Sequence, residues 1–196
     1  MKSYFQEMGE VNFPEFCGER IYMVPFRKSA PLPKSLTRWQ STVDMMTAHI
    51  DHDGPMYLMC DQGKVYAGQA HRRPGLHVDG NWIAEISDHY HPPTHFHPGY
   101  WKDGGGRWND AYTPETILLA SDVSACAGYS GEFNAPIGKG GEYSMTFSDS
   151  LERSVFKAHR CYAGNVTMLH ESLPVPIDCL RTVVRINIPG HQLEQT

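Results

Sequence analysis

Short runs of apolar residues, separated by turn residues, make up most of this chain. The runs are rich in valine, isoleucine, leucine and aromatic side chains, which is typical of β-strands. Many short strands broken by frequent turns favour an antiparallel barrel or jelly roll. We expect a hairpin turn over 61–64 and strands over 20–26, 56–60, 65–70, 116–123, 142–147, 155–157, 165–170 and 180–188.

Residues 35–49 follow a different pattern. Apolar side chains recur there at spacings of three and four, which predicts a helix. The positions that set this spacing are Leu36, Trp39, Val43, Met46 and Ile50. The sequence therefore indicates a mainly β fold with one flanking helix.

Residues 84–114 show little periodicity and are rich in histidine, proline and glycine. A long loop inside a compact domain is commonly a functional lid, so we expect a loop or lid here. The His-x-His pairs within 89–97 also suit a separate metal site, but no glutamate follows them at the spacing of a cupin motif. A lid, a separate metal site and a solvated loop therefore stay open.

Length, composition and charge limit the class of protein. The 196 residues, 40% of them hydrophobic, suffice for one core, so we expect a single domain over 1–196. The net charge of -5 argues against a protein that binds nucleic acid through many phosphate contacts. Five cysteines without a CxxC pair indicate reduced thiols. Residues 1–10 lack a signal pattern and no apolar run is long enough for a membrane span, so we expect a cytoplasmic protein with no membrane partner.

The motif His77-Val78-Asp79 is the leading candidate for chemistry. Residues i and i+2 of a strand point to the same face, so His77 and Asp79 can reach one metal ion together. The motif alone has little specificity, because 11 histidines and 22 acidic residues in 196 positions make about one His-x-acid match expected by chance. The chain has a second match in His49 and Asp51, which interactions at the helix end and a turn explain well.

Residues near the C-terminus strengthen the case for a metal site at His77 and Asp79. His170 ends an apolar, strand-like run, and Arg181 opens another strand eleven residues later. Alternation puts Arg181, Val183, Arg185 and Asn187 on one face of that strand, opposite a mostly apolar face. Two arginines facing a core would be costly without an anion. Because guanidinium matches carboxylate in bidentate geometry, a dicarboxylate is the natural ligand.

The order of these residues resembles that of the 2-oxoglutarate/iron(II)-dependent dioxygenase superfamily. The resemblance rests on His77-x-Asp79, followed by His170 and Arg181, over roughly residues 66–188. The spacing of the C-terminal histidine and arginine is similar to that of the taurine dioxygenase branch. It implies a double-stranded β-helix, the jelly-roll, cupin-like barrel.

The resemblance also implies roles for individual residues. His77, Asp79 and His170 would hold iron(II), and this set leaves open positions for a co-substrate and O2. Arg181 would bind the distal carboxylate of 2-oxoglutarate. Arg185 would meet an anionic group of the substrate. The segment around Thr116 resembles the strand that carries a co-substrate-binding threonine, so Thr116 is a further candidate.

The implied function is hydroxylation of a substrate, with conversion of 2-oxoglutarate into succinate and CO2. The favoured substrate is a small anionic or amino-acid-like molecule, which Arg73 would meet near the entrance beside Arg185. A protein side chain and a nucleobase stay open as substrates. Two other classes also stay open: a non-catalytic cupin-like binding module, and a metal-dependent isomerase or hydrolase on the same barrel.

Overall fold

The computed structural model describes residues 1–72, 74–79, 82–83, 107–108, 114–133, 141–145 and 149–194. Arg73 lies outside them, and so does most of the loop or lid expected over 84–114. Within that stretch lies β6 (Arg107–Trp108), which pairs antiparallel with β5 (Trp82–Ile83) just before it.

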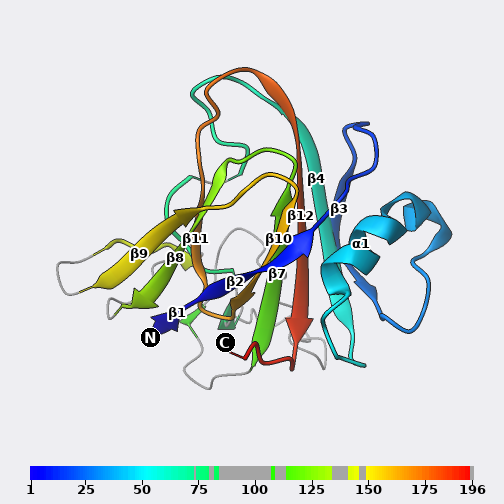
Figure 1. The fold of residues 1–196 in the computed structure, drawn as a ribbon, viewed down its shortest axis with the longest axis horizontal. Helices are drawn as coiled ribbons and strands as arrows, with labels where there is room; N and C mark the ends of the chain where they lie inside the picture. Colours follow the sequence, from blue (N-terminus) through cyan, green and yellow to red (C-terminus); the bar gives the residue numbers. More distant parts are fainter. Residues whose placement is uncertain are drawn as a thin grey trace, which may run out of the picture.

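Six antiparallel strands form the larger sheet, in the order β2-β10-β7-β12-β4-β3 (Figure 1). The central strand β12 pairs with β7 along one edge and with β4 along the other. The bounds of these strands are β2 Phe5–Glu10, β3 Arg20–Phe26, β4 Met56–Val65, β7 Glu115–Ser121, β10 Arg160–Asn165 and β12 Cys179–Pro189.

The smaller sheet is built around β8, which pairs antiparallel with three other strands. Its members are β1 Lys2–Ser3, β8 Cys126–Glu132, β9 Ser150–Val155 and β11 Leu169–Ser172. One apolar cluster joins the two sheets, because Ile117 and Val183 of the larger sheet pack with Cys126 of the smaller. We call the face of the larger sheet that carries this cluster its inner face.

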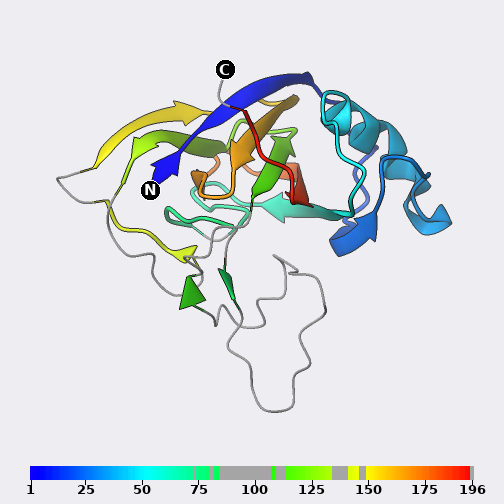
Figure 2. The same cartoon turned by 90° about the horizontal axis from the view of Figure 1, so that it is seen from below.

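The outer face of the larger sheet carries the helical segment. The 3-10 helix η1 (Lys34–Trp39) leads directly into α1 (Gln40–Thr47). Their apolar side chains, Trp39 among them, pack against Leu58, Leu118 and Ile186, and burial of this stripe stabilises the helix. Figure 2 shows this segment on the side away from the smaller sheet. The flanking helix is confirmed, although its first turns are 3-10 rather than α.

The hairpin turn expected over 61–64 is wrong. β4 continues through these residues and pairs with β12 as far as Val65. Gln62, one of the residues that suggested a turn, bonds to the segment just before β3: its Oε1 accepts the backbone N–H groups of Cys17 and Glu19, at 3.0 and 3.3 Å. Tertiary hydrogen bonds have therefore outweighed the local turn signal.

The described residues form a mainly β structure with two antiparallel sheets, the short β5–β6 pair and one short helix. The strands β2 and β8 were not expected from the sequence, since glycines and charged residues interrupt their apolar alternation. All five cysteines are free thiols, in keeping with the sequence. Among the described helices, none has the length and apolar character that a membrane span requires.

Candidate metal centre

His170 reaches the interior from β11 in the smaller sheet. Its neighbour Leu169 packs in an apolar cluster on the other face of the strand, so alternation turns His170 inward. Gly128 lies directly opposite His170 on β8. A Cβ atom at this glycine would lie 2.5 Å from the ring of Phe156, so the close packing behind His170 depends on the missing side chain.

His77 lies beside His170 because their backbones pair. The amide of each residue donates to the carbonyl of the other at 3.0 Å, and the two imidazole centroids are 4.5 Å apart. On its other side, the segment bonds to residues 141–143: the amide of Val78 donates to Gly141 O at 2.9 Å. His77 is thus held by isolated bridges to two antiparallel neighbours, and no regular strand continues through Asp79.

The backbone fixes the tautomer of both histidines. Nδ1 of His77 lies 2.8 Å from the carbonyl of Gly75, and Nδ1 of His170 lies 3.1 Å from the carbonyl of Met168. Since a carbonyl only accepts hydrogen bonds, each Nδ1 carries the proton and donates. Nε2 of each ring is therefore the nitrogen that is left to face Asp79, and it is the atom that can bind a metal ion.

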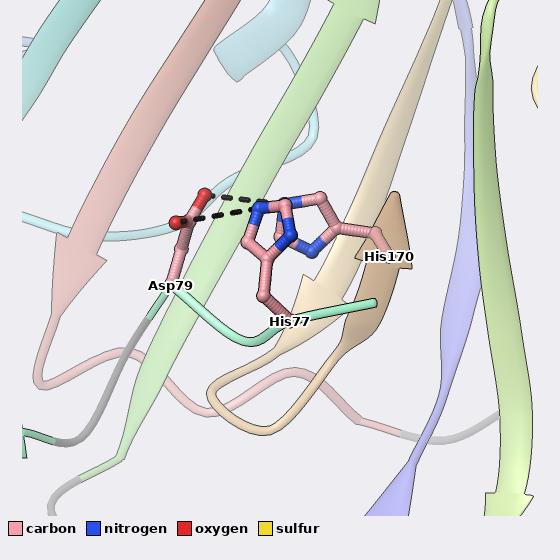
Figure 3. Close-up of side chains that lie close together, drawn as sticks. All are labelled: His77, Asp79 and His170. Carbon is pink, nitrogen blue, oxygen red and sulfur yellow. Dashed lines mark hydrogen bonds and ion pairs between the residues drawn. The ribbon is translucent and has the colours of Figure 1, made fainter. Parts of the chain in front are cut away.

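Asp79 completes the group (Figure 3). Its Oδ2 lies 3.2 Å from Nε2 of His170 and its Oδ1 lies 3.9 Å from Nε2 of His77. The three ligand atoms all lie within 4.8 Å of one another. Burial alone would raise the pKa of Asp79, but the guanidinium of Arg185 and then the two histidines hold it well below its usual value. The carboxyl group is therefore ionised, the state in which carboxylates bind metals.

Arg185 contacts this carboxylate from the inner face of β12. Its Nη1 donates to Oδ2 of Asp79, and its Nη2 lies 3.8 Å from the sulfur of Met23. Its Nε is buried and has no hydrogen-bond partner among the residues described here. One cation therefore already neutralises Asp79, which leaves part of the guanidinium available.

Glu115 and Asn187 lie next to Arg185 in this interior. Both are buried, and Nδ2 of Asn187 donates to Oε1 of Glu115 at 2.7 Å. Burial raises the pKa of Glu115 to about 7, although the contacts with Asn187 and Arg185 oppose this rise. The sequence did not single out either residue for function, because an isolated glutamate at a strand start is usually exposed.

Arg181 is buried completely, four positions before Arg185 on the same face. Its Nε donates to Ser121 at 3.1 Å, Nη1 to Ser172 at 3.2 Å, and Nη2 to the carbonyl of Ala125 at 3.1 Å. In the part of the chain that the structure describes, no carboxylate forms an ion pair with it. A buried cation held only by neutral acceptors is a natural partner for an anion.

Thr116 does not join these residues. Its neighbours Glu115 and Ile117 point inward from β7, so Thr116 points to the outer face, where its hydroxyl lies 2.8 Å from Nδ1 of His191. The structure therefore brings together His77, Asp79, His170 and Arg185, places Arg181 further along the same face, and leaves Thr116 apart.

Asp61 anchors the segment that leads to His77. Nη1 of Arg72 lies 2.7 Å from one of its carboxylate oxygens, and Arg20 Nε and His71 Nε2 lie 3.1 and 3.6 Å from the other. Contact with His71 and with Arg72 lowers the pKa of Asp61 against the opposing effect of burial. The sequence prediction missed this role because it placed Asp61 in a turn.

The second His-x-acid match, His49 and Asp51, is not part of a metal-binding cluster among the described residues. His49 is exposed just beyond α1, and it joins no cluster with Asp51. Among the described residues, His77, Asp79 and His170 alone bring three potential ligand atoms together.

Two imidazoles and a carboxylate can hold a divalent transition metal. Ligand atoms around an octahedral ion at about 2.1 Å lie about 3 Å apart, so the group needs to contract by up to about 2 Å at its widest separation. Iron(II) and zinc(II) both accept this donor set. Comparisons of the chain with protein-family models, curated proteins and solved structures gave no match.

Proposed function

We propose that this protein is an Fe(II)- and 2-oxoglutarate-dependent dioxygenase that hydroxylates a small molecule, on a double-stranded β-helix. One observation carries the proposal: the His-Asp-His group lies beside Arg185, and on the same face of β12 lies a fully buried Arg181 that forms no ion pair with a carboxylate among the described residues. The His-Asp-His group can hold the metal and Arg181 can hold a diacid beside it.

The residues present fit a ferrous ion. Both histidines bond to the backbone through Nδ1 and face Asp79 through Nε2, and Asp79 is ionised. Three protein ligands would leave three positions open for co-substrate and O2. When bound, this metal supplies the oxidative decarboxylation of 2-oxoglutarate to succinate and CO2, coupled to oxidation of the substrate.

In this proposal Arg181 anchors the distal carboxylate of 2-oxoglutarate. Arg181 and Arg185 are four residues apart on β12, so their Cα atoms are about 13 Å apart. Ser121 and Ser172 hold the guanidinium plane in place without neutralising its charge. Four of its five N–H groups already donate to neutral acceptors, so a carboxylate that reaches Arg181 would meet its positive charge and the remaining N–H of Nη1.

Arg185 orients the carboxylate of Asp79 and would meet a negatively charged group of the substrate. It is the nearest cation to the proposed metal. This favours a small anionic or amino-acid-like substrate over a protein side chain or a nucleobase.

The test is spectroscopic. Anaerobic protein with Fe(II) and 2-oxoglutarate should develop a weak visible charge-transfer band, and oxygen should then yield succinate. The change His77→Ala should abolish both signals, because it removes one ligand. The matched control is His49→Ala, which removes the exposed histidine of the competing motif and should leave the band intact.

A missing band together with absent succinate would reject the oxygenase proposal. If the protein then still bound zinc(II) at His77, the proposal of a metal-dependent hydrolase or isomerase would replace the oxygenase proposal. If the protein bound no metal, the proposal of a non-catalytic binding module would replace it.

A further inference from the structure

Two buried polar atoms near the proposed metal lack partners among the described residues: Nε of Arg185 and Oδ1 of Asn187. A buried donor or acceptor without a hydrogen bond costs on the order of 1–3 kcal/mol, and folded proteins contain few of them. These two lie at positions i and i+2 of one strand, on the same inner face. Nε belongs to the cationic guanidinium of Arg185 and donates, whereas Oδ1 of Asn187 accepts. A ligand that satisfies both atoms must carry a hydrogen-bond acceptor and a hydrogen-bond donor.

Glu115 adds a carboxyl group to the acceptor side. The hydrogen bond from Nδ2 of Asn187 to Oε1 of Glu115 fixes the amide, so that its Oδ1 remains an acceptor. A carboxylate and an amide oxygen side by side are suited to an ammonium group, which has three donors and no acceptor. On the donor side, Arg185 carries the guanidinium.

We infer that the substrate is a zwitterion, an amino acid or a close derivative with a free ammonium group, whose carboxylate binds Arg185 and whose ammonium binds Glu115 and Asn187. This inference rests on the proposed function, because it takes the interior beside His77, Asp79 and His170 as the substrate site. A purely anionic ligand would bring a second negative charge against Glu115. A purely cationic ligand would meet Arg185.

The burial of Glu115 fits this role. Its pKa of about 7 leaves the carboxyl group ready to ionise when a positive charge arrives. In the absence of ligand, partial protonation limits the cost of a second carboxylate close to Asp79.

The experiment uses calorimetry on zinc(II)-loaded protein, which needs no oxygenase chemistry. The probes are the twenty common L-amino acids and, for each one that binds, the matching 2-hydroxy acid and des-amino acid. We expect at least one amino acid to bind, and its two counterparts to bind at least tenfold more weakly. These comparisons use the unaltered protein, so they do not depend on how a variant folds.

The variant Glu115→Gln keeps the shape of the side chain and removes its charge. This variant should bring the ratio of the affinity for the amino acid to the affinity for the hydroxy acid close to one. The control Glu7→Gln, at a surface ion pair, should keep the full preference. Absence of binding by every amino acid, or a preference unchanged in Glu115→Gln, would overturn the inference.

Failure of the proposed oxygenase function can be distinguished from failure of the inferred zwitterion site. If amino acids bind as described but no charge-transfer band or succinate appears, the zwitterion site stands and the oxygenase assignment falls. If the band and succinate appear but no amino acid binds, the reverse holds.

Discussion

Burial determines the pH range in which the carboxyl group of Glu115 titrates. Burial raises its pKa from 4.5 to about 7, so the folded protein holds this proton more tightly than the unfolded chain. The unfolded state therefore binds fewer protons between these values, and the free energy of unfolding falls as pH rises through this window. The full shift corresponds to about 3 kcal/mol.

Replacing Glu115 by Gln removes this titration. We expect Glu115→Gln to gain about 3 kcal/mol in unfolding free energy relative to the unaltered protein between pH 4 and pH 8. Urea denaturation at both pH values measures the difference. An equal difference at the two pH values would show that Glu115 does not titrate in this range.

Individual residues show which parts of the candidate site could be predicted from the sequence. The spacing of His77 and Asp79, the position of His170 and the alternation along β12 predicted residues that come together. Thr116 shows the limit, because a shift of one position along a strand moves a side chain to the opposite face. The family-like segment forms β7, where Glu115 rather than Thr116 points inward.

At the level of elements, the segment between β4 and His77 depends on docking rather than on regular structure. It runs beside β11 and the residues that follow: the amide of Gly68 donates to Val175 O at 2.8 Å, and the amide of Arg72 to Ser172 Oγ at 3.3 Å. Asp61 adds the ion pair to Arg72. The metal ligands thus gain their positions from contacts that no local pattern encodes.

Replacing Asp61 by Asn should weaken this docking. We expect Asp61→Asn to lower the free energy of unfolding by about 1–2 kcal/mol at pH 7, a discounted figure because its arginine partners are partly exposed. The folded pKa of Asp61 is lowered, so its contribution is complete above the unfolded value near 4 and is lost as pH falls below it.

Denaturation curves at pH 7 and in acid test this expectation. The loss caused by Asp61→Asn should shrink below about pH 4. The exposed ion-pair residue Glu10 provides the control, since Glu10→Gln should change stability little at either pH. A loss that persists unchanged in acid would assign the effect to packing instead of charge.

For the whole molecule, the sequence predicted a mainly β structure with one helix but not the strand order. β12 lies between β7 and β4 because its apolar outer side chains share a core with theirs and with α1, whereas local propensity says nothing about such distant partners. The helix could be located because its stripe has a period that strands lack. The polar interior between the sheets emerges only when both are assembled.

That interior also determines how the protein should respond to metal removal. Arg185 balances Asp79 in the absence of any ion, so chelator-treated protein should still unfold cooperatively, and added zinc(II) should raise its melting temperature only by mass action. The variant Arg185→Met should lose more thermal stability in the stripped form than in the loaded form, as scanning calorimetry can measure. Equal losses in both forms would contradict this.

A chain with a built-in counter-ion does not need to be synthesised in the presence of its metal. Zinc fingers, by contrast, unfold when the ion is taken away. If His77, Asp79 and His170 hold a metal ion as proposed, a period of metal scarcity should leave the protein folded and able to take up the ion again without new synthesis.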